Sequence, residues 1–321
     1  MSNLFALFRR AFVARPPVPS GSSQGAEALE QASVKETLRK IRRIEIVSNR
    51  IANDVSSGQY KSAFRGQGIE FDETREYAEG DDVRTIDWNV TARAGKPYVK
   101  RFSEERERSL LFMLDASASN LFGSRRSRLE TATEIATTLM FSALKNNDKI
   151  GLLVFADGVK KYFPPRKGKN YALRLTREML LVKPEREKTN LNAALEFLDR
   201  TLKKRAVVFI LSDFYVPQLE REATLCRRRY DLVAISVTEP LEDAFPNVGF
   251  VALEDPETGA VVEFDSGSKR VRAAISERLR NKRASIAAKL KESRVESIFI
   301  ENGSDYARTL RAFFQARKKQ H

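Results

Sequence analysis

The fold class follows from one segment, Ser109-Leu-Leu-Phe-Met-Leu-Asp115-Ala-Ser117-Ala-Ser119. Its apolar run fits a strand buried on both faces, and such strands are typical of parallel sheets covered by helices. The acid and the two serines then follow the carboxyl end of the strand, where open α/β sheets bind their ligands. Carboxylate and hydroxyl oxygens suit Mg²⁺, Mn²⁺ or Ca²⁺ better than Zn²⁺. The segment therefore predicts a parallel sheet with a candidate cation site at its edge.

Strand and helix patterns alternate from Leu110 onward, which predicts a doubly wound α/β fold, mostly parallel and flanked by helices. Strands are predicted at residues 110–115, 149–155, 206–211, 232–237 and 295–300. Hairpins are predicted at residues 156–163 and 248–264. Helices are predicted at residues 128–146, 170–181, 190–204, 218–229, 268–294 and 305–318. An N-terminal segment, helical and then extended, is expected to pack on this sheet.

Composition excludes several classes of protein. Among 321 residues, 42% are hydrophobic, yet no apolar run is long enough to span a bilayer, and Arg9 and Arg10 interrupt any secretory signal. A single cysteine, Cys226, leaves no internal disulfide and favours a cytoplasmic location. Three arginines follow Cys226, which would lower its thiol pKa, but a small packed residue is the favoured interpretation. The only histidine, His321, ends the chain, so Ser-His-Asp and Cys-His catalysis are not expected, and no P-loop motif occurs.

The net charge of +14 is unevenly distributed. Residues 266–321 carry 15 Lys and Arg against 5 Asp and Glu, whereas residues 109–265 carry 23 against 22. Any polyanionic partner should therefore be sought at the C-terminus, along the basic helix 268–294, and not in the balanced central segment. Aromatic residues are not interleaved with the basic ones there, which argues against stacking on single-stranded nucleic acid.

Residues 70–87 hold eight acids and two arginines. One interpretation is a carboxylate cluster that binds a metal or a basic partner. The favoured one is a clasp, in which Arg75, Arg84 and Arg93 neutralise the acids at the edge of the next domain. The alternation in residues 97–102 predicts an edge strand after it.

Oxygen-bearing side chains follow two predicted strands and precede one helix. Asp115 and Asp213 each end a buried strand, and Thr189 stands near a helix start, where it has the alternative role of an N-cap. Because parallel strands end at the same edge, these residues and the serines 117 and 119 are expected to lie together.

This order of residues resembles the von Willebrand factor A fold with its metal-ion-dependent adhesion site. The resemblance implies a divalent cation, most readily Mg²⁺, with an open position that an acidic side chain of a partner fills. It also implies the ligand set, namely Asp115, Ser117, Ser119, Thr189 and Asp213.

Upstream motifs resemble the bacterial family called domain of unknown function 58. They are Glu70-Phe71, Arg75-Glu-Tyr77, Gly80-Asp-Asp-Val-Arg84, Ile86-Asp87-Trp88 and Ala92-Arg93, with Asp148-Lys-Ile-Gly-Leu-Leu-Val-Phe155 downstream. The motif positions without an assigned role are Arg75, Asp81, Asp82, Arg84, Asp87, Trp88 and Arg93. A methionine commonly stands where this chain has Asn120. The family is often encoded beside MoxR-type AAA ATPases, which implies an adaptor or chaperone-like partner of such a motor.

We expect four parts in the chain. Residues 1–28 are predicted to be a disordered tail and linker, of which a basic amphipathic stretch, 1–14, contacts a membrane peripherally or docks locally. The others are an N-terminal helix and acidic extended segment (29–108), a von Willebrand factor A-like domain (109–265) and basic C-terminal helices that complete the fold (266–321).

The leading functional hypothesis is a non-enzymatic, cation-dependent protein-binding module without a small-molecule substrate. One alternative is a module that binds nucleic acid or another anionic surface through the basic C-terminal helix. A second alternative is a hydrolase that uses the carboxylates of residues 70–87 with the ion, which requires those acids to lie near Asp115.

Overall fold

A computed structural model describes residues 39–52, 69–104, 107–121, 123, 126–184, 189–215, 220–254 and 259–320. The predictions for residues 1–28 and for the connector 54–67 lie outside these ranges. Within them, no helix is long and apolar enough to cross a lipid bilayer.

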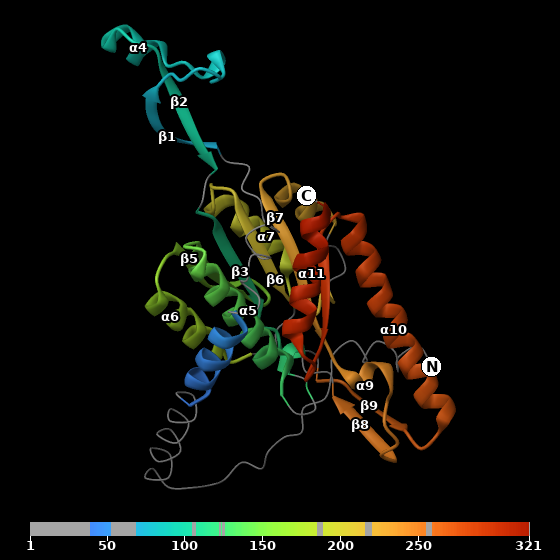
Figure 1. Cartoon of the computed structure of the whole chain (residues 1–321). Coiled ribbons are helices and arrows are strands. Elements are labelled where there is room, and N and C mark those ends of the chain that lie inside the picture. Colours follow the sequence, from blue (N-terminus) through green and yellow to red (C-terminus); the bar gives the residue numbers. More distant parts are fainter. Residues whose placement is uncertain are drawn as a thin grey trace.

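The centre of the molecule is a six-stranded sheet in the order β10-β7-β6-β3-β4-β5 (Figure 1). Five strands are parallel, namely β3 (Ser109–Asp115), β4 (Lys149–Phe155), β6 (Ala206–Leu211), β7 (Tyr230–Thr238) and β10 (Glu296–Glu301). Strand β5 (Val159–Arg166) pairs antiparallel with β4 at the edge. Counted along the chain, the six strands lie in the order 3-2-1-4-5-6, which is the doubly wound order. The predicted fold class is confirmed.

Helices cover both faces of the sheet because each strand is apolar on both faces. Phe112 and Leu114 of β3 belong to one core with α5 (Arg128–Lys145), α6 (Lys169–Leu180) and α11 (Tyr306–Gln320). Leu111 and Met113 belong to the other, with α7 (Leu191–Thr201), α8 (Glu220–Cys226) and α10 (Lys269–Glu292). Cys226 is buried in the second core, as the packed-residue interpretation predicts.

Most predicted element bounds agree with the structure to within two residues. Two helices end three residues before their predicted ends: α7 ends at Thr201 rather than at residue 204, and α8 ends at Cys226 rather than at residue 229. Leu202 takes an extended conformation and buries its side chain, so the three basic residues that follow lie in the turn before β6.

The N-terminal helical and extended segments behave differently. Residues 39–52 form a helix on the α5–α6 layer, where the Ser48 hydroxyl accepts a hydrogen bond from Thr138 Oγ1 (3.1 Å). In contrast, β1 (Ile69–Glu76) and β2 (Tyr98–Glu104) form their own antiparallel hairpin with η1 (Val83–Thr85) and α4 (Trp88–Ala94). This hairpin projects from the end of the sheet at which the parallel strands begin, which we call the amino edge (Figure 1). The strand predicted at 97–102 exists, but it pairs with β1 and does not extend the central sheet.

A second small hairpin precedes α10. Strands β8 (Phe250–Glu254) and β9 (Val261–Asp265) bury Val262 and Phe264 against Ile275 of α10. The short helix α9 (Pro240–Asp243) lies between β7 and this hairpin and packs near α10 (Figure 1). Helix α9 and the β8–β9 hairpin lie toward the end of the sheet at which the parallel strands finish, which we call the carboxyl edge.

Candidate cation site at the carboxyl edge

Strands β3 and β6 mark the point where the strand order reverses, which is where doubly wound sheets leave a crevice for ligands. Asp115 ends β3, and Asp213 follows β6 by two residues. Both carboxylates are buried, with 1% and 4% of their surfaces exposed. The topology therefore brings two predicted ligands from distant parts of the chain to one edge.

The loop after β3 folds back onto the Asp115 carboxylate. Asp115 Oδ1 accepts a hydrogen bond from the Ser117 backbone N–H (2.9 Å), and the hydroxyls of Ser117 and Ser119 lie 2.9 Å apart. Asn120, which departs from the family pattern, donates from Nδ2 to the Asp115 carbonyl and to Ser117 Oγ, both at 3.3 Å. The loop thus holds one carboxylate and two hydroxyls together, and Asn120 supports it rather than disrupting it.

Ser212 connects the two strand ends and was not anticipated from the sequence. Its hydroxyl donates to Asp115 Oδ2 (2.6 Å) and accepts from the Phe214 backbone N–H (3.1 Å). Phe214 has a φ of 56°, a left-handed conformation that is uncommon for a bulky residue and tends to occur at functional sites. The only sequence signal was the position of this serine, directly after a buried strand.

Thr189 reaches the same edge through its neighbour. The Asn190 backbone N–H donates to the carbonyl of Ala156 (2.6 Å), and the adjacent Phe155 carbonyl accepts from Ala116 N (2.7 Å). Asn190, not Thr189, caps α7, because its side chain accepts from Ala193 N. The N-cap alternative for Thr189 is therefore wrong. Thr189 Oγ1 is buried and has no hydrogen-bond partner within the described ranges.

The electrostatics of the site favour a positive ligand. Burial, together with the nearby charge of Asp213, raises the pKa of Asp115 to about 6. Asp213 Oδ1 accepts from Tyr215 N (3.0 Å), whereas its buried Oδ2 has no partner among the described residues. Among the residues that the structure describes, no cationic side chain forms an ion pair with Asp115 or Asp213. Two adjacent buried carboxylates lower the stability of the fold unless a cation compensates their charge.

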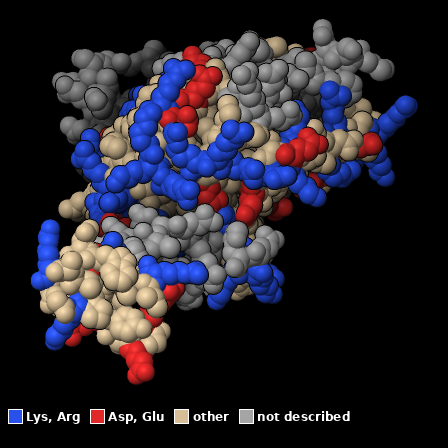
Figure 2. All heavy atoms as spheres, turned by 90° about the horizontal axis from the view of Figure 1, so that it is seen from above, with Lys and Arg blue, Asp and Glu red and all other residues tan. Residues whose placement is uncertain are grey.

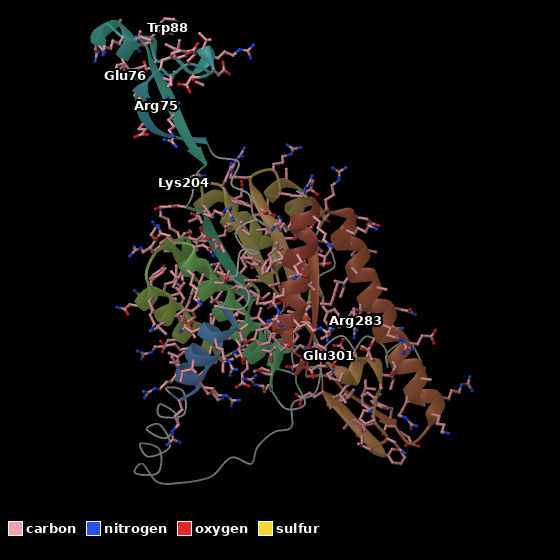
Figure 3. All side chains as sticks on the ribbon, in the orientation of Figure 1. Arg75, Glu76, Trp88, Lys204, Arg283 and Glu301 are labelled. Carbon is pink, nitrogen blue, oxygen red and sulfur yellow. The ribbon has the colours of Figure 1, made fainter. Side chains whose placement is uncertain are left out.

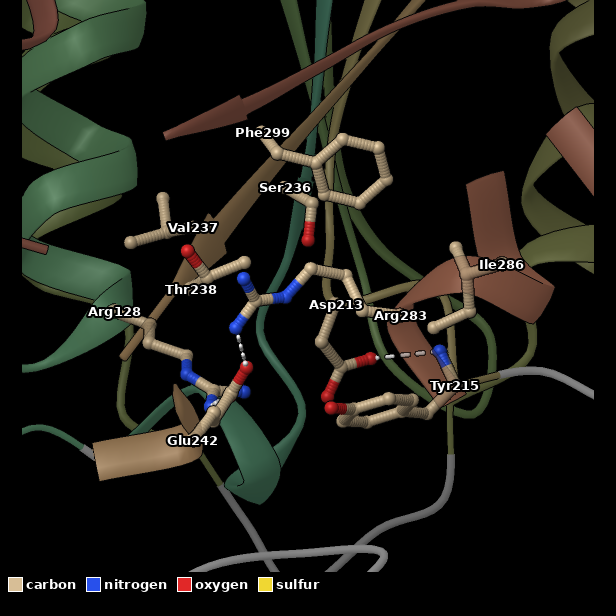
Figure 4. Close-up of a pocket in the computed structure, with 10 residues that line it drawn as sticks. All are labelled: Arg128, Asp213, Tyr215, Ser236, Val237, Thr238, Glu242, Arg283, Ile286 and Phe299. Carbon is tan, nitrogen blue, oxygen red and sulfur yellow. Dashed lines mark hydrogen bonds and ion pairs between the residues drawn. The ribbon is translucent and has the colours of Figure 1, made fainter. Parts of the chain in front are cut away.

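A buried ionic cluster forms one wall beside Asp213 (Figure 4). Arg128, with 5% of its surface exposed, is hydrogen-bonded to Glu242, and Arg283 pairs with the same carboxylate at 3.1 Å. The cavity between them measures about 10 Å³, which is room for roughly one water-sized ligand. Both arginines of this wall thus pair with Glu242, and the charge of Asp213 also contributes to the raised pKa of Arg128.

The acidic hairpin lies at the opposite edge of the sheet from this site (Figure 3). Strand β3 separates the two over seven residues, which is about 20 Å at roughly 3.3 Å per residue. The arrangement required by the hydrolase alternative, with these acids near Asp115, is therefore not present. The described residues also contain no group of three or more His, Cys, Asp or Glu that would hold a metal.

The clasp interpretation of the hairpin is correct for only one of its three arginines. Arg75 pairs with Asp81 at 2.5 Å, and Asp81 Oδ2 accepts from Ala78 N (2.8 Å), so the contact closes the hairpin on itself. Among the described side chains, Arg84 and Arg93 form no ion pair with an acid. Asp87 instead caps α4 by accepting from Asn89 N and Val90 N, and Trp88 has 69% of its surface exposed.

Comparison with known proteins identifies the family. The model of the family described as "Protein of unknown function DUF58" matches residues 73–285, more than half of the chain. The chain belongs to this family. It is 30% identical over 228 residues to Uncharacterized protein Rv1480 of Mycobacterium tuberculosis, covering 70% of this chain and 72% of that protein. It is 25% identical over 107 residues to Uncharacterized protein YeaD of Bacillus subtilis, covering 33% of this chain and 25% of YeaD.

Solved structures resemble the family member more distantly. An aerotolerance-related membrane protein from Bacteroides fragilis, with multiple mutations to serines, has a TM-score of 0.45 and 18% identity, covering 67% of this chain and 100% of that one. The conserved hypothetical protein BatB from Bacteroides thetaiotaomicron has a TM-score of 0.41 and 14% identity, covering 67% and 99%. The fold assignment rests on the strand order and register of the sheet itself.

Proposed function

We propose that the carboxyl-edge site holds a divalent cation and that the chain is a non-enzymatic, cation-dependent protein-binding module. The ligands would be Asp115, Ser117, Ser119, Thr189 and Asp213. The observation that carries the proposal is a pair of buried oxygens, Thr189 Oγ1 and Asp213 Oδ2, that have no hydrogen-bond partner among the described residues and belong to the same sheet edge as the buried carboxylate of Asp115. All the donors are hard oxygens, which favours Mg²⁺ first, with Mn²⁺ and Ca²⁺ as alternatives.

The residues of the site have separable tasks in this proposal. Ser212 and the Ser117 backbone orient Asp115, while Asn120 holds the serine loop. A bound ion would supply a positive centre to which the carboxylate of a protein partner adds as a further ligand. Because the donors come from three loops, the site would be sensitive to shifts of any one of them.

The partner class follows from this chemistry and from the family resemblance. An exposed Asp or Glu of a protein partner fits an open position on a hard cation, and a small-molecule substrate is not needed. The resemblance further suggests a MoxR-type AAA ATPase, or a client of one, as that partner. Purified ATPase should then bind in the presence of Mg²⁺ and dissociate when EDTA is added; binding that ignores EDTA would contradict this part of the proposal.

The cation itself is tested by thermal unfolding with and without Mg²⁺. At about 100 times its Kd, an ion that binds only the folded state adds roughly 2.7 kcal/mol to the free energy of unfolding. We expect this gain in the wild type and its loss in Asp213→Asn. The matched control is Asp157→Asn, an exposed acid in the turn after β4, which should keep the gain. Failure of Asp213→Asn to fold would assign Asp213 a structural role instead.

A further inference from the structure

The amino edge of the sheet gathers basic residues from four segments. Helices in a parallel α/β fold run opposite to the strands, so α7, α8, α10 and α11 all end at this edge (Figure 1). Each of these ends carries exposed Lys or Arg side chains. They are Lys203, Lys204 and Arg205; Arg227 and Arg228; Lys291 and Arg294; Lys318 and Lys319. We call these nine residues the amino-edge surface.

Strand register places the segments side by side. Ala206 pairs with Tyr230, so the residues before β6 lie next to those before β7, and Glu296 pairs with Val233, which adds the turn before β10. Neighbouring strands lie about 4.8 Å apart, so these turns form a continuous row. In the view from above, blue side chains gather over this face of the molecule (Figure 2).

Neighbouring acids do not neutralise the surface. Asp199 pairs with Arg229 at 2.9 Å, and Asp231 and Glu296 pair with the buried Arg317 at 2.5 and 3.6 Å. Those acids are therefore used by cations outside the set of nine. Within the described ranges, none of the nine forms an ion pair, and Glu292 is the exposed acid that remains nearby.

Helix stability alone does not account for this accumulation. A cation near a helix C-terminus stabilises the helix by roughly 0.3–1 kcal/mol, and the effect falls off within the last turn. One cation per helix would supply that gain. Three consecutive cations after α7 and two after α8, in the neighbouring turns before β6 and β7, instead repel one another. An anionic ligand would relieve that repulsion.

The shape of this edge selects the kind of polyanion. The β1–β2 hairpin rises from the same edge (Figure 1), by about 20 Å at roughly 3.3 Å per residue, so a flat bilayer would meet its tip before the basic residues. A rod-shaped polyanion can lie beside the hairpin. The four segments contribute no exposed aromatic side chain for stacking on unpaired bases, because Tyr230 is buried.

We propose that the amino-edge surface binds the phosphate backbone of double-stranded nucleic acid, without reading its sequence. This surface is separate from the candidate cation site, so either proposal can fail alone. It also differs from a basic C-terminal helix acting by itself, because most of the nine cations lie outside α10. Backbone contacts of this kind release counterions and make affinity fall steeply with salt.

The test is fluorescence anisotropy with a labelled, mixed-sequence DNA duplex of about 20 base pairs, titrated between about 50 and 200 mM salt. Arg227→Gln/Arg228→Gln should weaken binding by about tenfold and lower the slope of log affinity against log salt by about 1.8, or 0.9 for each phosphate that is no longer neutralised. The matched control is Lys269→Gln/Arg270→Gln, which removes two exposed cations from the opposite end of α10. It should bind like the wild type.

Three outcomes would overturn the proposal. The first is wild-type protein that does not bind the duplex at the low-salt end. The second is an equal loss in both double variants, which would show that net charge alone drives binding. The third is a protein that does not bind the duplex but binds vesicles of phosphatidylcholine and phosphatidylglycerol, and loses this vesicle binding in Arg227→Gln/Arg228→Gln. That outcome would assign the surface to a membrane.

Discussion

The two edges of the central sheet handle charge in opposite ways. At the carboxyl edge, Asp115 and Asp213 are buried, and each carboxylate accepts at least one hydrogen bond that orients it. At the amino edge, nine cations are exposed and their side chains are not held by acids among the described residues. A buried charge requires a specific partner because desolvation is costly, whereas an exposed one is satisfied by water and counterions. The first edge therefore suits one small ion, and the second an extended polyanion.

The largest expected effect is at the buried wall of the carboxyl edge. Arg128→Met would leave Glu242 without one of its two arginines in a buried position. We expect the free energy of unfolding to fall by about 3–5 kcal/mol, measured by urea denaturation. Arg128→Met/Glu242→Met should recover part of this loss. A single variant with wild-type stability would show that burial at this edge carries no such cost.

Thr189→Val separates a ligand role from a structural one. Valine has nearly the same shape, and Thr189 Oγ1 makes no hydrogen bond to a described residue, so stability without cation should stay within about 0.5 kcal/mol. Mg²⁺ affinity, measured by calorimetry, should fall about tenfold, or about 1.4 kcal/mol. Unchanged affinity would remove Thr189 from the ligand set. Asn190→Ala removes the side chain that caps α7, so it should lower the free energy of unfolding without cation and leave the Mg²⁺ affinity unchanged.

The pH dependence of the carboxyl edge follows from Asp115. Its folded-state pKa, about 6, is above the ordinary value of 3.8, so the folded state holds the proton more tightly than the unfolded state. Stability without cation should therefore fall as pH rises from about 4 to about 6. Because the proton competes with the ion, Mg²⁺ affinity should be about tenfold lower at pH 5 than at pH 8. An affinity independent of pH over this range would contradict ligation by Asp115.

Removing cations from the amino edge should hardly change stability. Arg227→Gln/Arg228→Gln is expected to alter the free energy of unfolding by no more than about 0.5 kcal/mol, since these side chains are exposed and form no ion pair with a described residue. Urea denaturation at low salt measures it. A loss comparable to that of Arg128→Met would mean that the amino edge is structural and would erase the contrast between the two edges.

The smallest effect is expected in the projecting hairpin. The hydrogen bonds from Arg75 and from Ala78 N lower the pKa of Asp81 in the folded hairpin. This interaction therefore stabilises the hairpin at pH values above the pKa of Asp81 in the unfolded chain. The stabilisation is lost as the pH falls through the lower pKa of Asp81 in the folded state. Arg75→Gln should return the Asp81 pKa toward its ordinary value in an NMR titration. The global melting temperature should be unchanged, because the interaction is exposed and local. A lowered melting temperature would show that the hairpin supports the sheet.

Local features of the candidate site were predictable, and its supporting contacts were not. An apolar run followed by Asp115, Ser117 and Ser119 indicates a buried strand and its ligand-bearing end from neighbouring residues alone. The bond from Ser212 to Asp115 joins residues 97 positions apart, and the one between Arg128 and Glu242 joins residues 114 apart. No local pattern carries such pairings, because they depend on strand order and register. The choice between Thr189 and Asn190 as the cap also required backbone geometry.

Charge shows most clearly what the sequence determined alone and what the tertiary structure decided. Counting residues gave a balanced segment, 109–265, and an excess of cations in residues 266–321. The order of strands then brought Lys203–Arg205 and Arg227–Arg228 of the balanced segment beside Lys291, Arg294 and the end of α11. Composition depends only on which residues are present. A surface depends on which helix ends the parallel sheet collects at one edge, and only the folded topology specifies that.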